Sequence, residues 1–483
     1  MSQTDMLSKD KALFEAAPRI YPQKVRGTFR TIKWGLMVIT LGVYYLLPFL
    51  RWDRGPGAPD QAVLVDLPGR RLYFFFIEIW PQEVYYLTGL LILAAMVLFL
   101  MNAIAGRIWC GYLCWQTVWT DMFMAVERWI EGDRRGMMKL DKEPWSFRKI
   151  RLKLTKHFLW VLISLFTGGA WVLYFADAPT LMNQLLHFKA SFDAYLWIAI
   201  LTATTYLFAG WAREQVCIYM CPWPRIQAAL TDDEALNVSY LVDRGEPRGS
   251  IKQQKRNLAK GLPAGDCIDC RQCVNVCPTG VDIRKGLQLP CIQCGLCIDA
   301  CDAIMTKVGK PTGLITYESE VNLERRLEGK ETTRPKIFRP RTLIYMFSLV
   351  LVTALMGWSY FSRSSSGMSV LHDRNPIYVK LSNGGIRNGY TVRILNMKIK
   401  QRNFRLGVEG FKGLKMKIVG NAPTPSGDYI IKLPKDSTLE LRVLLSSPPG
   451  LKLAKSVPVT FRSTEIETGE VSTVTDFFKS PGK

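Results

Sequence analysis

Long apolar runs without charged residues occur five times along the chain. Each is close to the ~20 residues that a helix needs to cross the hydrocarbon core of a membrane. A buried core helix is the ordinary alternative for any single run, but five of this length together predict a polytopic α-helical membrane protein. The runs are residues 34–50, 84–106, 157–176, 194–212 and 343–361.

After the last run the pattern changes to a period of two. Residues 362–483 contain short segments in which apolar and polar residues alternate, such as PIYVKL, YTVRIL, DYIIKL and LELRVLL. Turn-forming stretches such as SNGG, GNAPTPSG and SSPPG separate them. About seven strands with a turn every ~8–12 residues predict an all-β immunoglobulin-like sandwich.

Lysine and arginine between the runs predict how the chain is oriented, because positive charge collects on the cytoplasmic side of a membrane. Segment 1–33 carries seven, including Lys9 and Lys11, and loop 107–156 carries eleven. On the other side, 51–83 carries four and 177–193 only one. We therefore expect the first two segments in the cytoplasm, and alternation places 213–342 there too.

This orientation divides the chain into five parts. We expect a cytoplasmic N-terminal segment at 1–33, a four-span membrane domain at 34–212, a cytoplasmic region at 213–342, a fifth transmembrane helix at 343–361 and a periplasmic domain at 362–483. The apolar stretch LYFFFIEIW at 72–80 is too short to cross and contains Glu78. We expect it to be an interfacial or re-entrant piece.

The composition argues against nucleic-acid binding and against a transmembrane haem. The net charge of +22 is compatible with nucleic acid, anionic lipid or cytoplasmic membrane flanks, but no nucleic-acid-binding motif is present and the apolar runs favour the membrane. The chain has only three histidines, at positions that form no pair across the membrane, which disfavours a transmembrane bis-histidine haem.

The twelve cysteines all fall in short motifs. Two runs of four, CIDCRQCVNVCP and CIQCGLCIDAC, share the spacing C-x2-C-x2-C-x3-C. Each cysteine of the second run lies 24 residues after its counterpart in the first, so the segment is an internal duplication. This spacing is typical of a bacterial-type dicluster ferredoxin domain, which we place at 260–310 with an α+β fold.

In such a domain a short loop supplies three thiolates to one [4Fe–4S] cluster, and the fourth cysteine of the run binds the other cluster. Zinc also binds C-x2-C pairs, but it does not require this triple-plus-one pattern twice. Disulfides are disfavoured in a reducing cytoplasm. The predicted ligands are Cys267, Cys270, Cys273 and Cys301 for one cluster, and Cys291, Cys294, Cys297 and Cys277 for the other.

The remaining four cysteines form two C-x3-C pairs, Cys110/Cys114 and Cys217/Cys221, each just after an apolar run on the predicted cytoplasmic side. At i and i+4 two side chains project from one face of a helix. Buried cysteine often packs as a small apolar residue. The repetition instead favours a redox or metal role, because neighbouring runs would bring four thiols together and thiolates prefer Cu(I) or an iron–sulfur cluster.

Together these motifs resemble a known family, the bacterial cytochrome c oxidase accessory proteins called CcoG, FixG or RdxA. The resemblance covers almost the whole chain. It is carried by RIWCGYLCWQTVWTDMFMAVER, REQVCIYMCPW, VDRGEPRG, GDCIDCRQCVNVCPTGVDIRKGLQ, CIDACDAIM and HDRNPIYVKLSNGGIRNGYTVRI.

The resemblance implies a cupric reductase of the bacterial inner membrane, an iron–sulfur electron-transport protein that reduces Cu(II) to Cu(I) for copper-site assembly of a cbb-type cytochrome c oxidase. It implies partners among copper transporters, chaperones and oxidase assembly factors, with two [4Fe–4S] clusters as cofactors and copper as substrate or transient ligand. The electron donor stays unknown, and no nucleic acid is expected. The family's membrane motifs map onto Cys110, Cys114, Cys217 and Cys221, as catalytic and metal-binding residues.

The chain departs from the family at one position. Pro222 follows Cys221, but Trp115 follows Cys114, where the family usually has proline, so we expect a less sharply broken helix there. Two other functions fit the same motifs. One is a quinol-oxidising membrane polyferredoxin that feeds another reductase, and the other is a non-enzymatic scaffold for oxidase assembly.

Overall fold

The computed structural model describes residues 19–55, 58–398, 400–424, 428–435, 437–451 and 453–482. It divides into two compact units, residues 1–54 with 59–356 and residues 55–58 with 357–483, and each is described by itself. Lys9 and Lys11, which entered the charge count of segment 1–33, lie outside the described residues.

Four helices of the described residues are long and apolar enough to cross a membrane, and they coincide with four of the five predicted runs. The run at 157–176 falls in α6 (Phe147–Val172), which begins with a basic stretch and is not among these four. Five spans are therefore not established. The four are α1 (Thr28–Leu46) with η2 (Leu47–Phe49), α2 (Tyr85–Ala105), α8 (Phe192–Thr205) with η4 (Tyr206–Ala212), and α15 (Pro340–Phe361).

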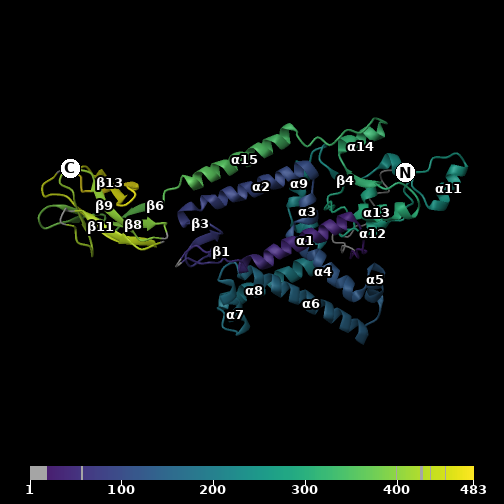
Figure 1. The fold of residues 1–483 in the computed structure, drawn as a ribbon, viewed down its shortest axis with the longest axis horizontal. Helices are drawn as coiled ribbons and strands as arrows, with labels where there is room; N and C mark the ends of the chain where they lie inside the picture. Colours follow the sequence, from purple (N-terminus) through teal and green to yellow (C-terminus); the bar gives the residue numbers. More distant parts are fainter. Residues whose placement is uncertain are drawn as a thin grey trace, which may run out of the picture. The chain divides into compact units, whose positions relative to one another are not determined.

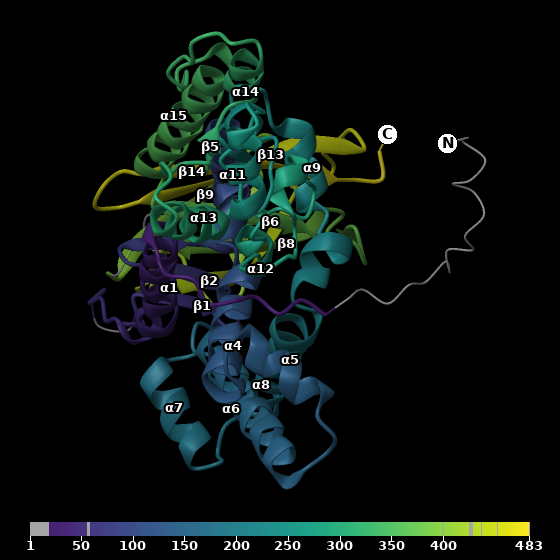
Figure 2. The same ribbon diagram turned by 90° about the vertical axis from the view of Figure 1, so that its right-hand side faces the viewer.

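Shorter helices connect these four. They are α3 (Ile108–Tyr112), α4 (Trp115–Glu131), α5 (Arg134–Lys142), α7 (Ala178–Leu186), η5 (Val216–Met220) and α9 (Trp223–Leu230). Helices α4, α6 and α8 lie side by side (Figures 1 and 2). Phe123 of α4 and Trp160 of α6 are buried in their shared core, with ring centroids 5.3 Å apart. Helix α4 therefore belongs to the packed helical part of the unit rather than to a loop.

The stretch 72–80 is part of a small antiparallel sheet of β1 (Val63–Asp66), β2 (Arg71–Phe74) and β3 (Ile77–Ile79). The 3-10 helix η3 (Pro81–Glu83) leads from this sheet into α2. Strand β2 pairs with β1 on one side and with β3 on the other, so this stretch belongs to a sheet. The expectation of a re-entrant piece is therefore wrong.

The ferredoxin region extends beyond the predicted 260–310. Its cysteines Cys267, Cys273 and Cys301 share one buried core with Val238 and Ile315. These two residues lie on β4 and β5, which pair antiparallel on either side of the cysteine runs. The elements are β4 (Asn237–Tyr240), α10 (Val242–Gly245), α11 (Ile251–Ala259), α12 (Gln272–Asn275), η6 (Ile283–Lys285), α13 (Leu296–Lys307), β5 (Ile315–Glu318) and α14 (Glu320–Leu327).

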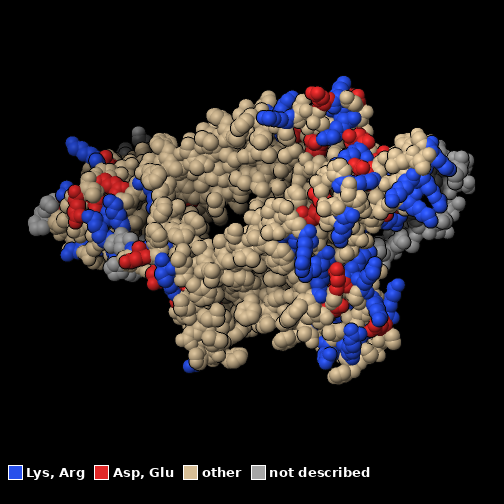
Figure 3. All heavy atoms as spheres, turned by 45° about the vertical axis from the view of Figure 1, so that its right-hand side comes forward, with Lys and Arg blue, Asp and Glu red and all other residues tan. Residues whose placement is uncertain are grey.

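Charged side chains are unevenly distributed over the unit. Figure 3 shows a broad surface over the helices with almost no lysine, arginine, aspartate or glutamate, next to a densely charged surface. Val38, Ile39 and Leu46 of α1 and Leu91 of α2 are more than 60% exposed, and other large apolar side chains of both helices are more than 40% exposed. A surface of this kind is typical of a protein surrounded by lipid.

The second unit is a two-sheet antiparallel sandwich, as the alternating pattern predicted. One sheet has the order β10–β12–β8–β6 with β7 also paired to β8, and the other has the order β11–β9–β13–β14. Tyr390 and Ile394 of one sheet and Phe404 and Phe461 of the other meet in one core. The strands are β6 (Ser366–His372), β7 (Val379–Lys380), β8 (Ile386–Asn396), β9 (Arg402–Glu409), β10 (Lys415–Ile418), β11 (Tyr429–Leu433), β12 (Ser437–Ser446), β13 (Ser456–Glu465) and β14 (Val471–Lys479).

A buried ion pair joins neighbouring strands of this sandwich. Arg402 donates from Nε and Nη2 to both carboxylate oxygens of Glu465, each at 2.6 Å, and both side chains are 0% exposed. Arg402 also reaches Glu470 at 2.7 Å. These hydrogen bonds hold the pKa of Glu465 below its ordinary value against the opposing effect of burial.

We predict that Arg402→Ala destabilises the sandwich by about 3–5 kcal/mol, because it leaves the buried Glu465 carboxylate without a counter-charge. Arg405→Ala on the same strand is the matched control, since Arg405 is 56% exposed and 3.6 Å from its partner Asp428. It should cost less than about 1 kcal/mol. Hydrogen exchange of β9 and β13 peptides in the full chain, across a denaturant series, measures both effects. Equal protection in the two variants would contradict the prediction.

The Arg402–Glu465 ion pair also predicts that the stability of the sandwich decreases in acid. Because the folded-state pKa of Glu465 is depressed, its stabilising contribution is complete above its unfolded pKa of about 4.3. The contribution is lost as the pH falls through the lower, folded-state pKa. We expect the protection factors of β13 amides, which correct for the slower intrinsic exchange in acid, to fall as the pH falls through this range in the native chain. They should change less in Glu465→Gln, which lacks the titrating group.

Candidate iron–sulfur and membrane cysteine site

Cysteines of both runs lie near one another in the ferredoxin region. The pKa of the Cys301 thiol is raised to about 12, mainly by burial, with smaller contributions from the charges of Cys273, Asp302, Cys270 and Cys267. Cys301 comes from α13, whereas the other three cysteines belong to the first cysteine run. Their assignment as the ligands of one cluster stays a prediction.

The second group forms around Cys297. Burial raises the pKa of this thiol well above its ordinary value, and the charges of Cys294, Cys291, Cys277 and Cys273 add to the increase. Cys277 is the last cysteine of the first run, so in the predicted sets each run contributes one thiol to the other group. Cys277 and the three cysteines of the second run line one small cavity, together with Cys273. The crossed ligand sets that the spacing predicts are compatible with this placement and stay a prediction.

Backbone conformation around the central cysteine is the same in both loops. Asp269 and Arg271, on either side of Cys270, have φ of 50° and 55°. Gln293 and Gly295, on either side of Cys294, have φ of 53° and 72°. Alternating conformations of this kind turn successive amide groups toward one point, which suits an anionic cluster.

These observations fit iron–sulfur clusters. Cys267, Cys273, Cys294 and Cys301 are buried, whereas Cys270 is exposed. The backbone amide of Val281 donates to Cys277 Sγ at 3.3 Å. The two sets would each hold one cluster, which supplies single-electron transfer when bound. The chain contributes the ligands, amide donors and an apolar surrounding, the features that set a cluster's reduction potential.

The two C-x3-C pairs sit in matching turns. Helix α2 ends at Gly106 with φ 50° and ψ −122°, four residues before Cys110. Helix η4 ends at Arg213 with φ 44° and ψ −118°, four residues before Cys217. Each left-handed residue redirects the chain into a short helix that carries the pair. The membrane half of the chain therefore contains a structural repeat that the cysteine positions only hinted at.

Helix α3 ends at Tyr112, two residues before Cys114, and η5 ends at Met220, directly before Cys221. The amide of Cys114 donates to the Trp109 carbonyl at 2.9 Å, and the amide of Cys221 donates to the Val216 carbonyl at 2.8 Å. Both cysteines are extended, with ψ of 129° and 123°. The expectation of a less sharp break before Trp115 is wrong, because this widened turn ends the helix without proline.

The four membrane-side thiols come together. Burial raises the pKa of Cys110 to about 12, and Cys114, Cys217 and Cys221 all lie close enough to influence it. Burial likewise raises the pKa of Cys217 to about 12, with contributions from Cys114 and Cys221. In the part of the chain that the structure describes, no three His, Cys, Asp or Glu side chains are arranged around a single ion. Joint binding of one ion therefore requires side-chain rotation.

Helix α3 is packed directly on the loop of the second cysteine group. A methyl group at Gly111 would lie 2.7 Å from the Ile292 carbonyl oxygen and 3.1 Å from Cys294 Cα. Tyr112 Oη donates to the Cys294 carbonyl at 3.0 Å. Cys110 itself packs against a buried cluster that contains Cys294. The membrane-side pair is thus in contact with the ferredoxin loop.

The other pair reaches the same region. Cys217 lines a small cavity with Pro278 and Thr279, which follow the predicted ligand Cys277. Ile292, between Cys291 and Cys294 in sequence, lines this cavity as well. Both C-x3-C pairs therefore lie beside one group of ferredoxin cysteines, the group of Cys277, Cys291, Cys294 and Cys297.

Three polar residues at this contact escaped the sequence analysis. Gln227 is 1% exposed and accepts a hydrogen bond from Cys110 Sγ at 3.2 Å. Gln293 accepts from the Arg107 amide at 2.8 Å. Arg107 donates in turn to the Pro224 carbonyl at 2.7 Å. Arg107 and Gln293 could have been singled out only because they are next to the cysteine motifs in the sequence. Gln227 is outside these motifs, so nothing in the sequence pointed to it.

Comparison with family models agrees with this division of the chain. Residues 87–133, with Cys110 and Cys114, match a model described as a 4Fe-4S binding domain. Residues 212–320, with the other ten cysteines, match a 4Fe-4S dicluster domain. Residues 356–481 match an IG-like fold at the C-terminus of FixG, whose description classes FixG among candidate oxidoreductases.

Several curated proteins resemble almost the entire chain. The nitrogen fixation protein FixG of Rhizobium meliloti is 47% identical, over 91% of this chain and 88% of the relative. Protein RdxA of Cereibacter sphaeroides is 48% identical over 90% and 91%, and RdxB of the same organism 48% over 93% and 93%. A crystal structure of a FixG-related protein from Vibrio parahaemolyticus matches 25% of this chain and 99% of its own, at 20% identity and a TM-score of 0.22.

The duplicated loops yield a prediction about Gly295. A side chain there would have to adopt φ 72°, and its Cβ would lie 2.7 Å from the Phe29 ring. Gly295→Ala should therefore destabilise the second cysteine loop by more than the ~1–2 kcal/mol of a left-handed residue. We expect a lower iron-to-protein ratio and a lower midpoint of thermal unfolding.

Arg271→Ala is the matched control, because Arg271 holds the equivalent position, is already left-handed and is exposed. Iron content in this variant should equal that of the native chain. Full iron content in Gly295→Ala would contradict the assigned packing.

Proposed function

This chain belongs to the family of FixG, RdxA and RdxB, iron–sulfur electron-transfer proteins, and we propose that it reduces Cu(II) to Cu(I). The Cu(I) would serve copper-site assembly of a cbb-type cytochrome c oxidase. The observation that carries the proposal is the meeting of Cys110, Cys114, Cys217 and Cys221 beside the ferredoxin loop. Copper transporters, chaperones and oxidase assembly factors are the proposed partners.

The reaction balances with one electron per copper ion. Cu(II) takes one electron and becomes Cu(I), and the electron comes from a donor of unidentified class. Thiolates stabilise the softer Cu(I) more than Cu(II), so a four-thiol site favours the product. At neutral pH the buried thiols of Cys110 and Cys217 are protonated, because their pKa values are raised to about 12. Metal binding as thiolates must therefore release protons.

We further propose five membrane spans, with the ferredoxin region in the cytoplasm and the β-sandwich in the periplasm of a bacterial inner membrane. The distribution of lysine and arginine between the apolar runs supports this orientation. Helix α6 would be the additional span. Its apolar C-terminal part would cross, and its basic first half would lie at the cytoplasmic surface.

A second candidate function is quinol oxidation. An apolar cavity of about 500 Å³ lies next to the first cysteine pair. Trp109, Leu113 and Trp115, which flank Cys110 and Cys114, contribute to its wall, as do Tyr44 and Trp119. A cavity of this size and aromatic lining would accept a quinone ring. Its position beside the thiols would let a quinol deliver electrons to the same site.

Replacement of one membrane-side pair tests the copper proposal. In Cys217→Ser/Cys221→Ser we expect the rate of Cu(II) reduction by the reduced protein to fall at least about 100-fold, because the thiolates that favour Cu(I) are lost. The iron content and the electron paramagnetic resonance spectrum of the clusters should not change. Anaerobic stopped-flow detection of Cu(I) with a chromogenic chelator measures the rate.

Met220→Leu is the matched control, since Met220 lies between the two cysteines and is 59% exposed. Its rate should stay within about twofold of the native value. Native copper reduction in the double serine variant would refute the copper proposal. Cluster reduction by a quinol, without any response to Cu(II), would favour the quinol function instead.

A further inference from the structure

A cavity of about 750 Å³ lies where the first apolar helix meets the ferredoxin region. Its walls are the segment before α1 and the first turns of that helix, the second half of α4, and three residues of the ferredoxin region. Those three are Val276 and Pro278, on either side of Cys277, and Leu296, next to Cys297. The volume lies within the ~300–1,000 Å³ typical of ligand sites.

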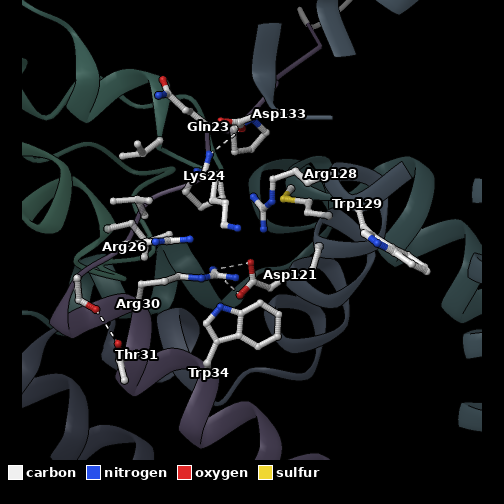
Figure 4. Close-up of a pocket in the computed structure, with 18 residues that line it drawn as sticks. Gln23, Lys24, Arg26, Arg30, Thr31, Trp34, Asp121, Arg128, Trp129 and Asp133 are labelled. Atoms are coloured by element: carbon white, nitrogen blue, oxygen red, sulfur yellow. Dashed lines mark hydrogen bonds and ion pairs between the residues drawn. The ribbon is translucent and has the colours of Figure 1, made fainter. Parts of the chain in front are cut away.

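Cationic side chains converge on this cavity. Figure 4 shows Lys24, Arg26 and Arg128 directed toward one another across it, with Arg30 below them. Four of the lining side chains are cationic and two are carboxylates. The cavity is therefore electropositive, although it is bordered by apolar residues of the ferredoxin region.

Three of the four cations have no carboxylate partner in the part of the chain that the structure describes. Among the described residues, no carboxylate lies within 4.0 Å of the charged nitrogen atoms of Lys24, Arg26 or Arg128. Burial lowers the pKa of Arg128, and the charges of Asp121 and Asp133 only partly oppose it. A partly buried guanidinium without a bound anion is costly, and Arg128 has no counter-ion of its own.

The two lining carboxylates are already engaged. Asp121 is held by both oxygens to Arg30 Nη1 at 2.8 and 2.9 Å, and it lies 3.7 Å from Lys33 Nζ. Asp133 accepts a hydrogen bond from the Lys24 amide at 2.9 Å. Arg30 stacks over the Trp34 ring at 4.6 Å, which fixes the floor of the cavity. The site thus has a set structure and an unbalanced positive charge.

The position at the end of an apolar helix indicates the kind of anion. Trp34 lies on α1, one of the four helices that are apolar enough to cross a membrane, and the ring of Trp129 is 79% exposed. Tryptophan is typical of the membrane–water interface. Basic pockets beside membrane helices bind the phosphate groups of anionic lipids. Arginine in particular suits phosphate, because its planar fork matches two oxygen atoms.

We propose that this cavity binds a phosphate ester, with Lys24, Arg26 and Arg128 as its cationic partners, and that the source is the headgroup of an anionic phospholipid. The bound headgroup would connect the start of α1 to the loop residues that flank Cys277 and Cys297. Neither copper nor quinol chemistry enters this inference, so its test is independent of theirs.

The test compares lipid binding by the full chain and two double variants after delipidation in detergent. Lys24→Gln/Arg128→Gln removes two cavity charges. The control, Arg135→Gln/Lys139→Gln, removes two exposed charges of α5 that lie outside the cavity. Native mass spectrometry measures binding of phosphatidylglycerol and phosphatidylcholine. Thermal shift with inorganic phosphate tests a soluble source, and visible absorbance of the clusters reports that each variant is folded.

We expect phosphatidylglycerol affinity to fall on the order of tenfold or more in the cavity variant, and to stay within twofold of native in the control. A thermal shift with inorganic phosphate, seen in the native chain and lost in the cavity variant, would support the same site with a soluble ligand. Equal losses in both double variants, native affinity in the cavity variant, or equal binding of the two lipids would each overturn the proposal.

Discussion

The architecture around the cysteines depends on the close backbone contact between helix α3 and the loop around Cys294. Gly111 has no room for a side chain there, and Tyr112 hydrogen-bonds the Cys294 carbonyl. Because interiors are close-packed, neither partner can shift without moving the other. A membrane-side cysteine turn and a ferredoxin loop are thereby fixed as one structure, which is the requirement for electron transfer between sites that they hold.

The two turns that lead into the cysteine pairs have different residues at the position with positive φ. The first turn places glycine at the left-handed position, where such a conformation carries little strain. The second places Arg213 there with φ 44°, which costs about 1–2 kcal/mol for a residue with a side chain. Arg213 offsets this cost through its guanidinium, which lies 2.8 Å from Glu127 and donates to the Gly210 carbonyl. The charge thus secures a turn that the backbone alone would disfavour.

The sequence predicts those parts of the site that depend on residues close to one another in the chain, and it does not predict contacts between residues far apart in the chain. The crossed cysteine sets are predicted from short spacing, since a loop of two residues between ligands leaves few geometries, and they stay a prediction. The alternation in residues 362–483 predicted the two sheets that the structure has. Gln227 and the left-handed Arg213 could not be foreseen, because their roles depend on contacts more than 80 residues away in sequence. The strand at Arg71–Phe74 was misread because its aromatic residues imitate a membrane segment.

Burial of the membrane-side thiols determines what the site can bind. A thiol with a pKa near 12 is protonated at neutral pH, as are Cys110 and Cys217. A hard cation binds sulfur weakly, so its binding does not supply the free energy needed to displace these protons. A soft ion or an iron–sulfur cluster forms strong enough bonds to sulfur to displace the protons. The family models place both pairs within iron–sulfur domain matches, and the apolar surroundings favour a low total charge. Any metal that binds these sulfur atoms has to displace their protons, and this requirement favours soft metals.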